Sequence, residues 1–337
     1  MYEQQIEEIR ARKVRMAICY DFDKTLSPDD MQTFTLIPSF GVDKATFWNE
    51  SNALAKANLM DSNLAWMYQL LNYSRAKRLP IKRDYFKKIG ADVPLYEGVE
   101  TWFDRINQYA KKNGIEVEHY IISSGLKEII EGSKIAKHFA RVYASSYLYS
   151  ADDVAEWPAQ AVNYTTKTQF IFRIAKGYLD EFDERVNDSM EDKLLRIPYE
   201  NIVYIGDSAT DIPCMRLVKS KGGYSIGVYD PANNQRKKVY QLFNDKRISF
   251  YAPAVYTARS DMMKYMKQII REIASREAMK TEQRVLELPA SVYKMYNMYE
   301  VVEQMIANSP EPVTARDKKK IADERAALKQ MIEGNID

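Results

Sequence analysis

Short, largely apolar runs alternate with stretches of helical periodicity from Val14 to Tyr251. The run from Val14 to Tyr20 has few polar positions, which is typical of a strand buried on both faces and hence of a parallel sheet. Glu100 to Lys112 has its large apolar residues at helical spacing instead. Further strands are expected at Tyr120–Ile122, Arg141–Tyr149, Ile202–Ile205, Tyr224–Tyr229 and Ile248–Tyr251. This alternation predicts an α/β fold, a doubly wound (Rossmann-like) parallel sheet with helices on both faces.

Two regions have helical patterns without strands between them. The first lies between Pro28 and Pro94, and the second follows Arg259. Helices are expected within them at Lys44–Glu50, Asn63–Leu71, Asp261–Thr281, Leu288–Ala307 and Asp317–Ile332. We therefore expect an α/β core (1–28 and 95–258), a helical insertion (29–94) and a helical C-terminal extension (259–337). The extension either packs on the core or forms a surface for a partner or a second copy, since Met and Tyr suit adaptable interfaces.

Composition limits the classes of partner. Lys and Arg number 49 against 47 Asp and Glu, so a net charge of +2 offers no electrostatic case for a nucleic-acid or membrane partner. The polar N-terminus does not resemble a signal peptide, and no apolar run approaches the length of a membrane span. Cys19 and Cys214 are the two cysteines, which fits a reduced, cytoplasmic protein. His119 and His138 have no partner cluster, so structural roles are expected for both.

Candidate chemistry begins with Asp21 and Asp23, which follow the first predicted strand. Ligands of open parallel sheets bind at the carboxyl ends of the strands. If strand geometry continues past Tyr20, the two carboxylates share one face. Their mutual repulsion favours a cation or a reaction at this place. A capping or turn role is an equally good explanation of the pair taken alone.

Two other strands end in polar residues. The strand Ile202–Ile205 is followed by Gly206-Asp207-Ser208-Ala209-Thr210-Asp211, and Tyr120–Ile122 is followed by Ser123-Ser124-Gly125. Gly206 permits a close backbone approach, and the spacing of Asp207 and Asp211 would put both on one side of a helix's first turn. Acids, hydroxyls and open N–H groups at one sheet edge suit a phosphoryl group with Mg²⁺.

In their order and spacing these motifs resemble those of the haloacid dehalogenase superfamily of phosphotransferases. Asp21-Phe22-Asp23-Lys24-Thr25 is similar to its Asp-x-Asp-x-Thr motif, Ser123 to its strand-end Ser/Thr, and Gly206-Asp207 through Asp211 to its Gly-Asp-x-x-x-Asp motif. The superfamily's lone lysine is best matched by Lys167, at the start of a predicted helix, with Lys176 as the alternative. The resemblance covers residues 12 to 230. A helical insertion after the first motif is similar to the cap of phosphoserine-phosphatase-like members.

The resemblance implies a role for each site residue. Asp21 would attack phosphorus to form an aspartyl-phosphate, and Asp23 would act as general acid and base. Mg²⁺ would be held by Asp21, Asp207 and the backbone carbonyl of Asp23, with Asp211 acting through water or orienting its neighbours. The phosphoryl group would be bound by Thr25, Ser123, Ser124, Gly125 and Lys167.

We therefore expect a Mg²⁺-dependent phosphomonoester hydrolase acting on a small phosphorylated metabolite. The acid at Asp23 disfavours the dehalogenase and P-type ATPase branches, which lack it. A phosphomutase or phosphotransferase shares the machinery, and a non-catalytic scaffold using the C-terminal helices is a third possibility, as is a homo-oligomer formed through them. Trp48, Trp66 and Tyr68 of the helical insertion either line the substrate pocket or form the insertion's own core.

Overall fold

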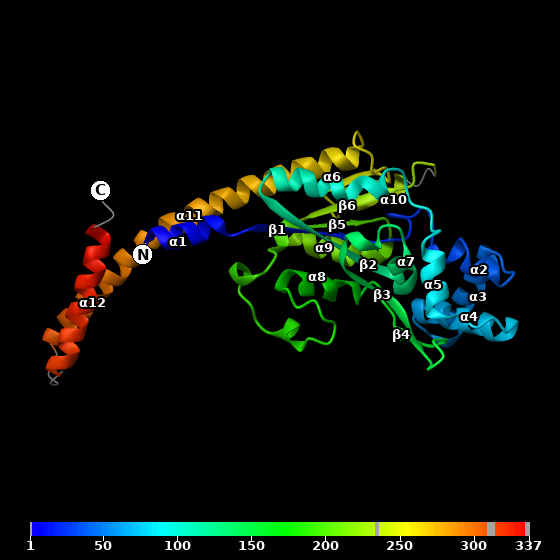
Figure 1. Cartoon of the computed structure of the whole chain (residues 1–337), viewed down its shortest axis with the longest axis horizontal. Coiled ribbons are helices and arrows are strands. Elements are labelled where there is room, and N and C mark those ends of the chain that lie inside the picture. Colours follow the sequence, from blue (N-terminus) through cyan, green and yellow to red (C-terminus); the bar gives the residue numbers. More distant parts are fainter. Residues whose placement is uncertain (1, 233–235, 309–313, 334–337) are drawn as a thin grey trace. The chain divides into compact units, whose positions relative to one another are not determined.

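The computed structural model describes residues 2–232, 236–308 and 314–333. Its centre is a seven-stranded sheet in the order β4-β3-β2-β1-β5-β6-β7, in which only the β3–β4 pair is antiparallel. The strands are β1 Val14–Tyr20, β2 Ile115–Leu126, β3 Phe139–Tyr149, β4 Ala155–Gln160, β5 Ile202–Gly206, β6 Tyr224–Tyr229 and β7 Phe250–Pro253. The predicted parallel α/β fold is confirmed (Figure 1).

The register brings the carboxyl ends of three strands to one edge. Tyr20, the last residue of β1, pairs with Ile121 of β2 on one side and with Ile205 of β5 on the other. Strand order reverses at β1, because the chain adds β2 on one side and β5 on the other. Such a switch point leaves a crevice beyond the strand ends, and this is where ligands bind in open α/β sheets.

The described residues also form helices, some of which cover the two faces of the sheet. The helices are α1 Tyr2–Ala11, α2 Leu36–Ser39, α3 Lys44–Asn58, α4 Ser62–Lys77, α5 Arg83–Gly90, α6 Val99–Lys112, α7 Lys127–Gly132, α8 Lys167–Lys176, α9 Ile212–Ser220, α10 Arg236–Asn244, α11 Asp261–Ala307 and α12 Ala315–Glu333. Helices α8 and α9 lie on one face and α6 on the other (Figure 1). Cys19 belongs to the cluster packed against α8 and α9, whereas Tyr20 packs on Phe103 of α6. This alternation follows from the period of two along a strand.

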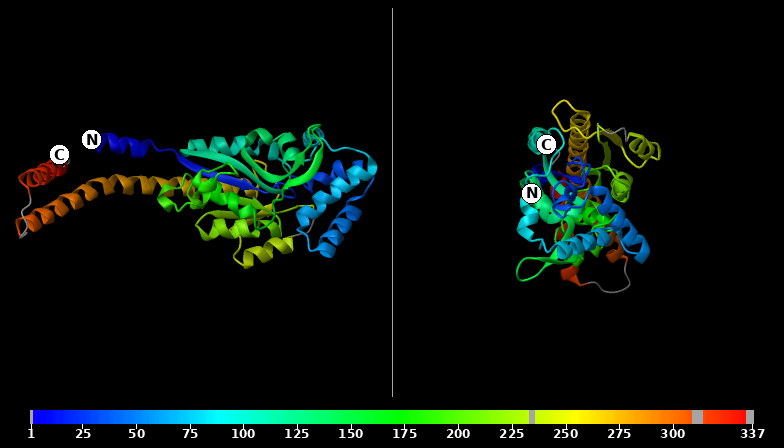
Figure 2. Two further views of the ribbon diagram at one scale, coloured as in Figure 1. Left: turned by 90° about the horizontal axis from the view of Figure 1, so that it is seen from below. Right: turned by 90° about the vertical axis from the view of Figure 1, so that its right-hand side faces the viewer.

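The helical insertion consists of α2 to α5, which are grouped beyond one end of the sheet (Figure 2). Hydrogen bonds tie α4 to the core. Among them, Asn63 Nδ2 donates to the Val162 carbonyl at 2.8 Å, and the Tyr147 hydroxyl donates to the Met67 carbonyl at 2.8 Å. Tyr147 lies on β3, which pairs with β4. The sequence did not predict β4, because Pro158 within it argues against a strand except at a sheet edge, where β4 lies.

The chain divides into two compact units, Val14–Ile273 and Met1–Lys13 with Ala274–Asp337. In the smaller unit, Arg325 of α12 pairs with Glu300 of α11 at 3.3 Å and lies over the Tyr296 ring. The two helices expected at Asp261–Thr281 and Leu288–Ala307 are one continuous helix, α11, since the residues between them are good helix formers. The boundaries proposed above for core, insertion and extension stay a prediction.

None of the helices built from the described residues combines the length and the apolar character that a membrane crossing requires.

Candidate active site

The candidate site lies where β1, β2 and β5 end. Asp21 follows β1, Ser124 and Gly125 lie in the last part of β2, and Asp207 follows β5. The backbone N–H of Asp21 donates to the Ile205 carbonyl at 2.9 Å, which holds the first residue after β1 against β5. The sequence motifs far apart in the chain therefore meet at the switch point of the sheet.

The chain turns immediately after Asp21. The Phe22 carbonyl accepts hydrogen bonds from three successive N–H groups, those of Thr25, Leu26 and Ser27. The expected continuation of strand geometry through Asp23 is therefore wrong, because β1 ends at Tyr20 and a turn follows. Asp21 and Asp23 nevertheless line the same cavity, so it is the turn that brings the two carboxylates to one site.

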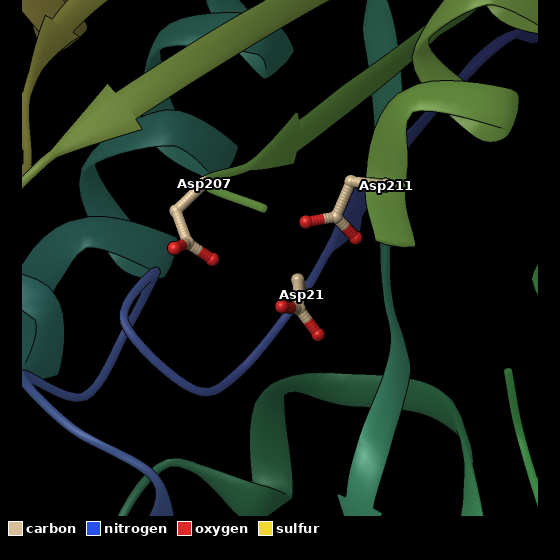
Figure 3. A group of neighbouring side chains, drawn as sticks. All are labelled: Asp21, Asp207 and Asp211. Atoms are coloured by element: carbon tan, nitrogen blue, oxygen red, sulfur yellow. The ribbon is translucent and has the colours of Figure 1, made fainter. Parts of the chain in front are cut away.

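Three carboxylates converge at the centre of the site. Oxygen atoms of Asp21, Asp207 and Asp211 lie within 4.8 Å of one another (Figure 3). The buried Lys167 ammonium contacts two of them, Asp21 Oδ1 at 3.1 Å and Asp211 Oδ1 at 2.7 Å. One lysine cannot neutralise three carboxylates, so the cluster retains negative charge that a cation would offset.

Asp211 is held by the protein on both of its oxygen atoms. The Tyr204 hydroxyl donates to Oδ1 at 2.8 Å, beside Lys167. The N–H and hydroxyl of Ser208 donate to Oδ2 at 3.1 and 2.8 Å. A carboxylate with four such partners is suited to orienting its neighbours. Tyr204 was missed in the sequence because a tyrosine within an apolar strand gives no signal of a polar contact.

The expected helical turn carrying Asp207 and Asp211 is wrong. Asp207 precedes a 3₁₀ turn, Ala209–Asp211, and α9 begins only at Ile212. The Asp211 side chain folds back over the end of β5, where a Cβ atom on Gly206 would lie 2.6 Å from its Oδ2. The close approach predicted for Gly206 is thus real, and its physical reason is the position of the Asp211 carboxylate.

Asp207 differs from Asp211 in its surroundings. Its carboxylate is half-buried, lines the cavity and receives no hydrogen bond from the described residues. Burial raises its pKa well above the usual range, and the charges of Asp211 and Asp21 raise it further. Its oxygen atoms are therefore available to a ligand that supplies positive charge.

Burial and neighbouring charges also shift the pKa values of Asp21, Asp23 and Lys167. Burial and, after it, the charge of Asp211 raise the pKa of Asp21 to about 6, although Lys167 opposes them. Burial raises the pKa of Asp23 well above its usual range, and the charges of Asp30 and Asp21 add to this, although the Met31 N–H opposes it. Burial alone would lower the pKa of Lys167, but Asp21 and Asp211 hold it above its ordinary value.

Of the two candidate lysines, Lys167 lies in the cluster. It is the first residue of α8. In the turn before this helix the Asn163 side chain accepts from the N–H groups of Thr165 and Thr166, both at 3.0 Å, and the Asn163 carbonyl accepts from the Lys167 N–H at 2.9 Å. Lys176, at the other end of α8, donates to the carbonyls of Val186 and Asp188.

The predicted phosphate-binding residues occupy different depths. Ser124 and Gly125 line the cavity, and they form an irregularity in β2 between the paired residues Ser123 and Leu126. The fully buried Ser123 hydroxyl accepts from the Gly125 N–H at 3.0 Å. Thr25 is also fully buried and its hydroxyl has no hydrogen-bond partner in the described part of the chain. Neither Ser123 nor Thr25 is among the described residues that line the cavity.

The cavity has a volume of about 420 Å³, within the range of small-molecule sites. Residues that the sequence did not single out also line it, among them Gln32, Ser208, Thr210 and Lys238. Gln32 and Lys238 lie outside the motifs, so only the fold could have brought them to the site. Trp48 and Trp66 line the cavity and also pack on each other, so pocket and insertion core share them. Tyr68 is not among the described lining residues.

Comparison with known proteins supports the resemblance of the strand-end motifs to those of the haloacid dehalogenase superfamily. The sequence profile of the haloacid dehalogenase-like hydrolases matches residues 18–216. A Borreliella burgdorferi protein, described only as uncharacterized, is 28% identical over 279 residues, which cover 76% of this chain and 96% of that protein.

Among solved structures, an aspartyl-phosphate intermediate analogue of phosphoserine phosphatase aligns with a TM-score of 0.47 and 17% identity, over 76% of this chain and 99% of that one. A hydrolase of the same family from Salmonella enterica serovar Typhi aligns with a TM-score of 0.45 and 16% identity. That alignment covers 64% of this chain and 63% of the Salmonella chain. The profile match spans more than half of the sequence and contains every strand-end motif described above. The chain belongs to the haloacid dehalogenase-like hydrolase family.

Proposed function

We propose that this protein is a Mg²⁺-dependent hydrolase of phosphate monoesters that acts on a small phosphorylated metabolite through an aspartyl-phosphate on Asp21. One observation carries the proposal: Asp21 is buried at the switch point, is held by Lys167 at 3.1 Å, and shares its cavity with a second acid, Asp23. A carboxylate nucleophile, a cation beside it and a separate proton donor are what phosphoryl transfer from an alcohol requires.

The donor set fits a magnesium ion. Mg²⁺ prefers carboxylate oxygens together with water and substrate oxygens. Asp21 and Asp207 would hold it, while Asp211, engaged by Lys167, Tyr204 and Ser208, would orient them. When bound, the ion supplies positive charge that draws the phosphoryl oxygens to the site and offsets their repulsion of the nucleophile.

Asp21 and Asp23 divide the chemistry between them. An Asp21 oxygen attacks phosphorus while the bond from phosphorus to the leaving oxygen breaks, and Asp23 donates its proton to that oxygen. The alcohol leaves, and Asp23 then takes a proton from a water molecule whose oxygen attacks phosphorus. Inorganic phosphate and the free Asp21 carboxylate are the products. The raised pKa of Asp23 supports its role as acid in the first step.

Lys167 supports both halves of this cycle. Its ammonium keeps Asp21 ionised against the effect of burial and offsets the charge of Asp211. It would also lie near a phosphoryl group attached to Asp21, since it contacts that carboxylate.

The test is hydrolysis of an aryl phosphate in the presence of Mg²⁺ by the wild type and by Asp21→Asn. Asparagine keeps the size of the side chain but lacks the charged nucleophile, so hydrolysis should be abolished. Mass spectrometry should confirm that the asparagine has not deamidated. Wild-type turnover by the intact variant would refute the proposal.

A further inference from the structure

We propose that the alcohol released by this enzyme is neutral and carries several hydroxyl groups, as a sugar or a nucleoside does, and is not an amino acid or a hydroxy acid. This inference rests on the proposed phosphomonoesterase function and names the substrate class of the same cavity. It comes from the part of the cavity lining that helices α3 and α4 contribute.

Helices α3 and α4 of the insertion contribute six of the described lining residues, and none of the six is charged. They are Trp48, Ser51, Asn52, Ser62, Asn63 and Trp66. A free amino acid or a carboxylate in this part of the cavity would have to leave water without an opposite charge beside it, which costs several kcal/mol per ion. A neutral alcohol avoids that cost.

The charged residues of the cavity come from other parts of the chain. Lys24 is engaged by Asp30 at 2.7 Å, and Lys238 is exposed on α10, where Asp207 is a neighbouring charge. Both lysines also line the neighbouring pocket together with Asp207. They are therefore suited to the phosphoryl end of a substrate, next to the carboxylate cluster.

Two buried side chains of the cavity wall have unused hydrogen-bonding atoms. Ser51 and Gln32 are each 2% exposed, yet Ser51 Oγ and Gln32 Oε1 have no hydrogen-bond partner within the described residues. The indole nitrogen of Trp48 is also buried and has no hydrogen-bond partner within the described residues. Gln32 lies in the 3₁₀ turn Met31–Thr33, and Ser51 and Trp48 lie on α3, but all three line the same cavity. An unpaired buried polar group costs about 1–3 kcal/mol, so such atoms among the lining residues call for a ligand that pairs with them.

These atoms specify the chemistry of that ligand. Gln32 Oε1 accepts only, the Trp48 indole donates only, and the Ser51 hydroxyl does either. A hydroxyl group can pair with each of them because it both donates and accepts. Several hydroxyls on one small molecule would therefore satisfy the wall without bringing a charge into it.

The indole rings of Trp48 and Trp66 add an aromatic surface that suits a sugar or a nucleoside. Trp48 and Trp66 pack edge to face with ring centroids 6.4 Å apart, and Asn63 accepts from the Trp66 indole at 3.2 Å, which fixes that ring. Aromatic faces accommodate the C–H face of a sugar or the face of a base. The volume of about 420 Å³ suffices for a molecule of this size.

The test compares kcat/KM of the full-length protein with Mg²⁺ across phosphate esters that differ in the leaving group. The neutral set is glucose 6-phosphate, ribose 5-phosphate and cytidine 5′-monophosphate, and the charged set is phosphoserine and 3-phosphoglycerate, with p-nitrophenyl phosphate as a reference. At least one neutral ester should exceed both charged esters by about tenfold or more, and the best of them tells a sugar from a nucleoside. A rate on either charged ester that equals or exceeds all neutral ones would overturn the inference while p-nitrophenyl phosphate cleavage upheld the proposed function. If no ester is cleaved, the proposed function fails and the inference with it.

The variant Ser51→Ala tests whether the α3 lining of the cavity causes the preference for neutral esters. Ser51→Ala should lower kcat/KM for the best neutral ester about fivefold, a larger loss than it causes for p-nitrophenyl phosphate, which lacks the hydroxyls. Asn49→Ala, an exposed position on α3 outside the cavity lining, is the matched control and should leave both rates unchanged. Equal losses on the two esters in Ser51→Ala would contradict the assigned contact.

Discussion

The Asn163 side chain donates a hydrogen bond of 2.9 Å to the carboxylate of Asp61, and each of the two residues lies just before a helix. Asp61 caps α4 of the helical insertion by accepting from the N–H groups of Asn63 and Leu64. Asn163 lies in the turn before α8, and its carbonyl accepts from the N–H of Lys167, the first residue of that helix. One hydrogen bond therefore connects the helix that carries Trp66 with the helix that carries the lysine of the carboxylate cluster.

Asn163→Ala should lower both stability and activity. Loss of the hydrogen bonds that the Asn163 side chain makes in the turn before α8 costs about 1 kcal/mol of unfolding free energy, and the start of α8 should loosen around Lys167. Urea unfolding and kcat/KM on an aryl phosphate measure the two effects. Asn58→Ala is the control, because Asn58 is exposed and its side chain bonds, among the described residues, to the Leu54 carbonyl of its own helix alone. If the two variants retain equal activity, the turn before α8 does not position Lys167.

Lys167→Met should reduce kcat by about 100-fold or more, because Asp21 and Asp211 lose the cation that they share. Lys176→Met is the matched control and should retain the wild-type rate, since Lys176 bonds to two carbonyls outside the site, those of Val186 and Asp188. Steady-state rates of the purified variants, with circular dichroism to confirm folding, provide the measurement. A comparable loss in Lys176→Met would point to the stability of α8 as the cause.

Asp207→Asn and Asp211→Asn should distinguish the carboxylate that binds Mg²⁺ from the carboxylate that orients its neighbours. We expect Asp207→Asn to weaken Mg²⁺ binding more than about 100-fold and Asp211→Asn about tenfold, since Asp211 acts on its neighbours. Asp211→Asn should be the less stable protein, because it leaves Lys167, Tyr204 and Ser208 with a poorer partner. Calorimetric titration and urea unfolding measure the two quantities. Equal losses of Mg²⁺ affinity would remove the distinction.

Asp23→Asn should slow cleavage of alkyl phosphates more than cleavage of aryl phosphates with acidic leaving groups. A poor leaving group needs the proton of Asp23, whereas a good one departs largely unaided. Single turnovers are required, because the same carboxylate activates water in the second step and would otherwise mask the trend. Uniform slowing of bond cleavage for both kinds of ester would exclude Asp23 as the general acid.

Acid should destabilise the protein through His119. Its ring nitrogens bond to the Tyr20 hydroxyl at 3.0 Å and to Asn107 at 2.9 Å, and burial lowers its pKa from 6.5 to about 3. Below pH 6.5 His119 therefore becomes protonated in the unfolded chain but stays neutral in the folded protein. The free energy of unfolding falls as the pH falls towards 3.

Between pH 7 and pH 5 the protonation of His119 in the unfolded chain should lower the free energy of unfolding by about 2 kcal/mol. Urea unfolding of the wild type and of His119→Gln at both values isolates it, because other groups contribute to both proteins. His138→Gln is the comparison, since His138 is only half-buried. Identical pH dependence of the wild type and His119→Gln would contradict the prediction.

The sequence alone determined the parallel strands of the core and the edge of the sheet at which the candidate site lies. Apolar runs such as Val14–Tyr20 mark strands because burial on both faces selects apolar side chains locally. Acids directly after such runs lie at the carboxyl edge of a parallel sheet whatever the details of packing. Asp21 and Asp207 could be singled out in this way, and the resemblance of their motifs is confirmed by the family match.

Only the tertiary structure decided how the side chains around these acids are paired. The sequence favours Lys167 over Lys176 because Lys167 opens a helix, but only the structure shows that Lys167 reaches Asp21 and Asp211 while Lys176 bonds to carbonyls at the other end of α8. The uncharged lining residues of α3 and α4 are likewise brought to the cavity by the fold. Lys167 is 146 positions from Asp21 and 44 from Asp211, and local periodicity holds no information on which residues so far apart meet.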